Sequence, residues 1–310
     1  MNLRENLPVV WSNRPTPTTD HKAEMNAVKA AAARVIDYRD RISVVTWLFV
    51  FGLGISQIYT LPTTLISLRA LGSPMSIALT RTLVAALFLA LLAAAGTESV
   101  VSIHPRFAAS TKYHFIRSWP FWALPMAIAI IAVYLLPLAP TRAIQILTIV
   151  AGGVLLAVAL FLHVTVERGQ SGFRRARFIL DALAYGAALL LFLFVYQTRT
   201  RSLLSGTLVA MTATLLAVEI LRTTTERSLV VLTYGAIVGV ILGQVTWALN
   251  YWWTLTNLNG GLLLLLTFYL VVGIAQYGIQ DHLNRRILWE FAIFAIVALI
   301  LIAVIGPRFG

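Results

Sequence analysis

Residues 234–250 read Tyr-Gly-Ala-Ile-Val-Gly-Val-Ile-Leu-Gly-Gln-Val-Thr-Trp-Ala-Leu-Asn, which places Gly235, Gly239 and Gly243 at every fourth position. On a helix this spacing makes one ridge without side chains, along which a second helix can approach backbone to backbone. The ridge lies inside a longer stretch, residues 228–280, that contains no charged residue. We therefore expect the three glycines to pack against another helix inside a membrane.

The composition of the whole chain agrees with a membrane location. Of its 310 residues, 59% are hydrophobic and 12% are charged, whereas a soluble domain has about 25% charged residues. The net charge of +12 fits basic residues that flank membrane spans on the cytoplasmic side, so we expect no nucleic-acid partner. The absence of cysteine excludes disulfides, thiol nucleophiles and cysteine-ligated metals.

The hydrophobic pattern divides the chain into two parts. Residues 1–41 are predicted to form a cytoplasmic arm with an amphipathic helix over about 20–41. That helix either lies on the membrane surface or continues into the first span, and an ordinary solvated helix is the alternative. Residues 42–310 are predicted to form a transmembrane helical domain.

The fold class predicted for the second part is an all-α polytopic transmembrane helix bundle, because its apolar runs have the length of membrane spans. We expect nine spans, with eight as the alternative, and a short interfacial segment between the first two. The predicted spans are Ile42–Tyr59, Ser76–Ala95, Trp119–Leu138, Ala143–Val166, Phe178–Tyr196, Ser202–Leu221, Ser228–Tyr251, Gly260–Tyr277 and Ile287–Ile305.

The distribution of Lys and Arg predicts the orientation of these spans. With the N-terminus in the cytoplasm and nine spans, eighteen Lys and Arg residues fall on the cytoplasmic side and six on the other. Cytoplasmic loops carry an excess of these residues. We therefore predict a multi-pass protein of the cell (plasma or inner) membrane, with the N-terminus inside and the C-terminus outside.

Four ionisable residues near the predicted cytoplasmic ends of spans form the first candidate site: His163, Asp181, Glu219 and Glu290. Each carboxylate has an arginine three or four residues away, so local interfacial ion pairs are the simpler interpretation. The alternative is that the four side chains converge in one polar vestibule. No charge falls at the middle of a predicted span, which argues against a carboxylate proton relay.

A second candidate site lies at the outer end of the predicted seventh span. Thr246 and Asn250 share the helix face of the three glycines and should point into the bundle. Interhelical hydrogen bonds and an aromatic belt explain such residues, and a pocket for a small ligand or lipid headgroup is the alternative. The candidate pocket residues are Thr246, Trp247, Asn250, Asn257 and Asn259.

The segment 167–177 is rich in arginine. It can bind anionic lipid headgroups, although the orientation rule alone also explains its charge. The residues concerned are Arg168, Arg174, Arg175 and Arg177. The five histidines are scattered and no metal-binding, phosphate-binding or hydrolase motif is present, so no metal and no cofactor is predicted.

The last third of the chain resembles a bacterial family of multi-pass membrane proteins of unknown function. The resemblance is carried by the runs Gln244-Val-Thr-Trp-Ala-Leu-Asn-Tyr-Trp-Trp, Asn257-Leu-Asn-Gly-Gly-Leu and Phe268-Tyr-Leu-Val-Val-Gly. It implies an uncharacterised membrane protein and assigns no catalytic residue.

Three functions are compatible with these features. The favoured one is a non-catalytic membrane subunit or scaffold that binds membrane lipids and a protein partner, or a second copy of itself, through the arm and the glycine ridge. The second is a carrier for an uncharged or lipid-like small molecule, using the pocket near Asn250. The third is a membrane-embedded enzyme that modifies lipid with the cytoplasmic carboxylates. Whether the protein is an enzyme stays open, and the sequence favours that it is not.

Overall fold

The structure is a computed structural model that describes residues 17–59, 62–70, 73–103, 118–165, 173–197, 202–225, 227–251 and 257–305. The chain divides into two compact units, residues 1–40 and 41–310. The described part of the first unit, residues 17–40, is helical throughout. All contacts described below lie within the second unit.

Helix α1 (Pro17–Ile58) supplies residues 41–58 to the second unit and is followed by a β-hairpin and helix α2 (Arg81–Val101). The hairpin pairs β1 (Thr64–Ala70) antiparallel with β2 (Ser73–Leu79), with Thr64 opposite Leu79. The prediction that a span begins at Ser76 is therefore wrong, because residues 73–79 are a strand. Thr80 starts α2 instead, since its hydroxyl accepts a hydrogen bond from the Leu83 amide at 3.2 Å.

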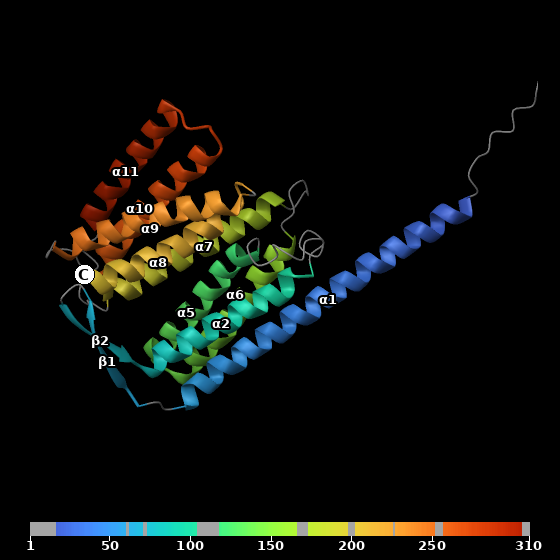
Figure 1. Cartoon of the computed structure of the whole chain (residues 1–310), viewed down its shortest axis with the longest axis horizontal. Coiled ribbons are helices and arrows are strands. Elements are labelled where there is room, and N and C mark those ends of the chain that lie inside the picture. The colour runs from blue at the N-terminus through green and yellow to red at the C-terminus, as the bar shows by residue number, and fades with distance from the viewer. Residues whose placement is uncertain are drawn as a thin grey trace, which may run out of the picture. The chain divides into compact units, whose positions relative to one another are not determined.

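Seven α-helices follow α2 over the described residues, and two short 3-10 segments flank the first of them. Figure 1 labels these helices as α5 to α11. The segments η1 and η2 contain Pro120 and Pro137, which suit such tight turns better than a helix interior. The elements are η1 (Trp119–Trp122), α5 (Ala123–Leu135), η2 (Leu136–Leu138), α6 (Arg142–Thr165), α7 (Phe173–Gln197), α8 (Ser202–Leu221), α9 (Ser228–Tyr251), α10 (Asn257–Ile279) and α11 (Arg285–Ile305).

The predicted fold class, an all-α polytopic bundle, is confirmed. Within the described residues, eight helices are long and apolar enough to cross a membrane. The apolar part of α8, Ser205–Leu221, is shorter than these eight and brings the number of apolar helices to nine. The hairpin is the one sheet among the described residues. Helix α7 begins at Phe173 and not at Phe178, so Arg174, Arg175 and Arg177 lie in its first turns and not in a loop.

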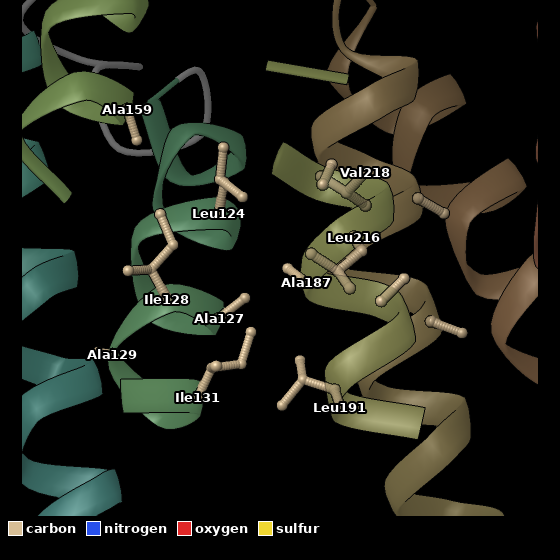
Figure 2. Packing of buried hydrophobic residues seen from close by; sticks show 14 of the residues in the cluster. Leu124, Ala127, Ile128, Ala129, Ile131, Ala159, Ala187, Leu191, Leu216 and Val218 are labelled. Atoms are coloured by element: carbon tan, nitrogen blue, oxygen red, sulfur yellow. The ribbon is translucent and has the colours of Figure 1, made fainter. Parts of the chain in front are cut away.

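Helix α5 lies at the centre of the core and contacts α2, α6, α7 and α8. Its side chains are buried almost all round, which is how a helix surrounded by other helices is expected to appear. Figure 2 shows Leu124, Ala127 and Ile131 of α5 facing Ala187 and Leu191 of α7. Small residues at these contacts allow the helices to approach closely.

The most extensive contact between two helices is that of α8 with α9. The three glycines of α9 lie along it. A Cβ atom at Gly239 would overlap Thr214 Oγ1 and lie 2.6 Å from the Ala210 carbonyl oxygen. A Cβ atom at Gly243 would lie 3.2 Å from the Gly206 carbonyl oxygen. The glycine ridge is thus filled by the backbone of α8, inside the same chain.

Helix α11 packs chiefly on α10. The contact is aromatic: Tyr269 and Phe294 have ring centroids 5.0 Å apart, and Tyr277 and Phe291 5.9 Å. Gly273 makes room for the Phe291 ring, which a Cβ atom at that position would approach to 2.6 Å. Apart from Arg285, Arg286 and Glu290 in its first turns, the rest of the α11 surface is exposed and apolar, as expected for a helix at the edge of a bundle that faces lipid.

Candidate functional site

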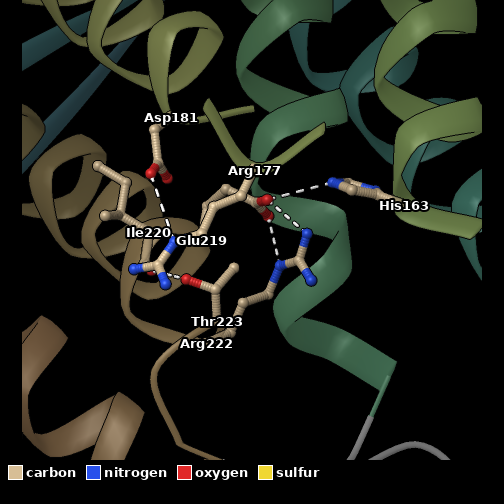
Figure 3. Close-up of polar contacts among 7 residues, drawn as sticks. All are labelled: His163, Arg177, Asp181, Glu219, Ile220, Arg222 and Thr223. Atoms are coloured by element: carbon tan, nitrogen blue, oxygen red, sulfur yellow. Dashed lines mark hydrogen bonds and ion pairs between the residues drawn. The ribbon is translucent and has the colours of Figure 1, made fainter. Parts of the chain in front are cut away.

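The helix ends bring one buried polar cluster together, formed by His163, Glu219 and Arg222 (Figure 3). His163 lies in the last turn of α6, Glu219 in the last turn of α8, and Arg222 directly after α8. The Glu219 side chain is 2% exposed and that of His163 is fully buried. In the predicted topology this is the cytoplasmic end of the bundle.

The Glu219 carboxylate accepts hydrogen bonds on both oxygens. Arg222 donates from Nε to Oε2 at 3.0 Å and from Nη2 to Oε1 at 2.6 Å, which is the two-pronged geometry typical of a strong arginine–carboxylate pair. His163 Nε2 lies 3.1 Å from Oε1. Because an ionised carboxylate only accepts, Nε2 carries the proton and donates it. The cluster therefore joins α6 to α8.

Phe121 of η1 completes the cluster. The Arg222 guanidinium lies 4.2 Å from the centre of its ring, and His163 meets the same ring edge-on at 5.6 Å. A cation over an aromatic face is stabilised by about 2 kcal/mol when it is desolvated. Phe121 thus shields the cationic face of the cluster and ties η1 to α6 and α8.

A second ion pair lies beside the cluster in α7. Arg177 Nε and Asp181 Oδ2 are 3.6 Å apart, and both side chains are 28% exposed. Figure 3 shows Arg177 reaching towards the end of α8 near Ile220. These residues form a partly exposed border to the buried cluster.

Glu290 does not take part in these contacts. It pairs with Arg286 on its own helix, α11, at 3.2 Å, and both side chains are well exposed. The structure therefore brings together His163 and Glu219, places Asp181 beside them, and gives Glu290 a local partner.

One acceptor of the cluster has no hydrogen-bond partner among the described residues. His163 Nδ1 is buried, and in the neutral imidazole, whose one proton lies on Nε2, it carries a lone pair. A buried polar atom without a partner costs free energy, about 1–3 kcal/mol in mutational data. A water molecule or a bound group with a donor would satisfy this atom.

The candidate pocket near the end of α9 is arranged differently. Asn250 donates from Nδ2 to Ser205 Oγ of α8 at 2.8 Å, and the buried Thr246 hydroxyl donates to the Leu242 carbonyl in its own helix at 2.8 Å. Trp247 is 54% exposed. Asn250 is thus bonded to the neighbouring helix α8, and Thr246 to the backbone of its own helix.

The other two polar residues of this candidate pocket, Asn257 and Asn259, lie at the start of α10. Asn259 is buried, and its Oδ1 has no hydrogen-bond partner among the described residues. Asn257 begins α10, and its side chain lies outside what the structure describes.

The arginine-rich segment is described in part. Arg174 and Arg175 are exposed at the start of α7, and Arg177 pairs with Asp181. Arg168 lies outside the described residues. Basic side chains at the end of a span suit anionic headgroups, because they reach from the apolar layer into the interface.

Sequence reasoning missed two contacts at this end of the bundle. The sequence places Phe121 in an apolar span, and nothing in its local sequence signals a cation above its ring. Nothing in the sequence singles out Glu98, whose carboxylate accepts a hydrogen bond from Trp122 Nε1 at 2.9 Å. Both contacts join segments that are distant in sequence, so local spacing carries no signal for them.

Apolar helices of spanning length, with charges gathered near helix ends, define the class: an α-helical membrane protein. A family model described as "Protein of unknown function (DUF5656)" matches residues 61–305, and the chain belongs to this family. The match covers most of the chain and, like the resemblance of the last third, points to a family of unknown function. No curated protein and no solved structure matches the chain.

Proposed function

We propose that this protein is a non-catalytic subunit or scaffold of the cell membrane that binds lipid and a protein partner. The observation that supports this role is the use of Glu219. Its buried carboxylate is occupied on both oxygens by Arg222 and His163, so it joins helices within the chain. A carboxylate held in this way is suited to bracing a bundle, because breaking such a pair leaves an uncompensated buried charge.

Lipid binding is supported by the surfaces of the helices. Exposed apolar side chains extend along α1 and α6, and exposed arginines stand at the start of α7. Hydrocarbon chains match the first kind of surface and anionic headgroups the second.

Two surfaces remain for a protein partner now that α8 fills the glycine ridge. One is the segment of about 20–41, which the sequence predicts to be an amphipathic helix. The other is the outward side of α11, where five exposed apolar residues fall within about 80° of one another at 100° per residue. They are Trp289, Ile293, Ile296, Ile300 and Val304.

Co-purification in a mild detergent tests the proposal. We expect native mass spectrometry to find phospholipid on the purified chain and proteomics to find one protein at constant ratio to it. Ile296→Lys, at the middle of the outward stripe of α11, should reduce recovery of that protein and leave the lipid in place. Purification without lipid and without any protein at constant ratio would contradict the proposal.

A second candidate function is a lipid-modifying enzyme, and His163 Nδ1 is the observation that favours it. This buried acceptor has no partner within the described chain and lies next to a carboxylate, as a general base would. The variant Glu219→Gln distinguishes the two candidate functions. A scaffold loses stability with this variant, whereas an enzyme loses turnover of added lipid even where the folded fraction is matched to the wild type.

A further inference from the structure

An apolar cavity of about 410 Å³ lies between α5, α6 and α7. Its size falls within the range of roughly 300–1,000 Å³ that small-molecule sites occupy. Apart from Thr148, whose hydroxyl donates to the Ile144 carbonyl of its own helix, every side chain that lines it is apolar. The lining residues of α5 are Ile128, Ile131, Ala132 and Leu135, and the others belong to α6 and α7.

Helices α6 and α7 present the same pattern to this cavity. Residues 147, 148, 151, 152 and 155 of α6 repeat the spacing of residues 182, 183, 186, 187 and 190 of α7. At 100° per residue each set covers an arc of about 140°, so each is one face of its helix. Small residues at the middle of both faces, Ala151 and Gly186, form the hollow. A Cβ atom at Gly186 would meet no atom within 4 Å.

The cavity opens sideways from the bundle. Leu147 and Leu155 at its border are 65% and 42% exposed, and Ala151 and Gly186 are exposed as well. Since these helices have the length and composition of membrane spans, the opening faces hydrocarbon. An occupant therefore enters from the bilayer and is itself apolar at this depth.

The face of α7 that lines the cavity continues towards a basic residue. Measured around the helix axis from Ala182, Ile179 lies at about 60° and Arg175 at about 20°. Both angles fall inside the arc of the lining residues. Both are exposed. From Ile179 to Leu190 the face is roughly 16 Å long, which matches the roughly 15 Å of hydrocarbon in one leaflet.

We propose that the cavity holds one acyl chain of an anionic phospholipid whose phosphate is bound by Arg175. The proposal rests on the lipid binding proposed above and names its site and its ligand class. The apolar face and its length match an acyl chain, and the cation at the polar end of the face matches the phosphate. In the predicted topology Arg175 lies at the cytoplasmic end of α7, where anionic lipids are attracted to basic segments.

Filling the cavity tests the site of the acyl chain. Wild-type protein in mild detergent with added phosphatidylglycerol should retain one lipid by native mass spectrometry and melt at a higher temperature than without it. Gly186→Leu should lose both effects, because the new side chain occupies the hollow. Gly54→Leu on α1 is the matched control, since a Cβ atom there also meets nothing within 4 Å and Gly54 does not line the cavity.

A second variant fills the same hollow from the opposite helix. Ala151→Phe on α6 should lose the lipid as Gly186→Leu does, so a folding failure of one variant leaves the other as the test. The acyl-chain site is wrong if a folded variant retains as much lipid as the wild type. In that case lipid on the wild-type protein still supports the proposed function, whereas a wild type without lipid contradicts both.

Headgroup binding is tested with a neighbouring pair of arginines. Arg175→Gln should abolish the preference for phosphatidylglycerol over phosphatidylcholine and leave lipid retention as such in place. Arg174→Gln is the control, because Arg174 falls at about −80° from Ala182 and lies outside the face. An equal preference in wild type and Arg175→Gln would assign the charge selectivity to other residues and overturn this part of the proposal.

Discussion

Glu219 is 2% exposed near the end of an apolar helix, and its carboxylate accepts hydrogen bonds from Arg222 and His163. The sequence predicts the first of these contacts, because positions three apart on a helix are neighbours. It does not predict the second, since His163 lies 56 residues away on α6. Whether the carboxylates form only local ion pairs or converge with His163 therefore depends on tertiary packing, which the spacing of charges along the sequence does not encode.

Removing this carboxylate should destabilise the protein strongly. Glu219→Gln leaves the Arg222 guanidinium, whose side chain is 10% exposed, without its counter-charge, and removing one partner of such a nearly buried pair is expected to cost about 3–5 kcal/mol. Thermal unfolding in detergent measures it. Glu290→Gln is the control, because that pair is exposed and such pairs contribute about 0–1 kcal/mol. Equal losses in both variants would contradict the bracing role of Glu219.

A smaller loss of stability is expected for a substitution of Asn250, at the second candidate site. Asn250→Ala removes the hydrogen bond to Ser205, and interhelical bonds of this kind average about 0.6 kcal/mol in membrane proteins. A double-mutant cycle with Ser205→Ala should show coupling of that size. If a small molecule binds here, Asn250→Ala should also abolish the stabilisation that it causes, which a thermal-shift screen of uncharged ligands detects.

At the scale of elements, the helices were predicted well and their ends less well. The apolar runs locate every described helix after the hairpin to within about six residues, because length and composition suffice for a span. The strand at Ser73–Leu79 was missed, since a short apolar run reads as helix or strand until its pairing is known. The start of α7 was placed too late because Arg174, Arg175 and Arg177 read as a loop, although arginines extend from a helix end into the interface.

The α8–α9 contact makes a prediction at this scale. Gly239→Leu should destabilise the bundle by about 3 kcal/mol or more, because the new side chain meets the α8 backbone at Ala210 and cannot be accommodated by a rotamer change. Gly278→Leu on α10 is the matched control, since a Cβ atom there meets nothing within 4 Å. An unchanged melting temperature for Gly239→Leu would show that the two helices do not meet as described.

At the scale of the molecule, orientation in the membrane follows from charge alone. Eighteen Lys and Arg residues against six predict that the connection after α10 is cytoplasmic and the connection before α6 is outside. Packing cannot supply this information, because an inverted bundle has the same internal contacts.

Cysteine labelling tests the orientation directly, since the chain contains no cysteine of its own. Thr141 and Leu283 are exposed residues in these two connections. A membrane-impermeant maleimide should label Thr141→Cys in intact cells and Leu283→Cys only after lysis. The reverse pattern would place the N-terminus outside and move the polar cluster and Arg175 to the outer leaflet.

The close α8–α9 pair also bears on how the protein is made. The two helices are joined by the short connection 222–227, so their glycine-lined contact is complete as soon as both have left the ribosome and the insertion machinery. Contacts between neighbours in sequence form with the least loss of chain entropy. During biogenesis this hairpin can therefore serve as an early nucleus, onto which α7 and α10, its neighbours in the chain, assemble from either side.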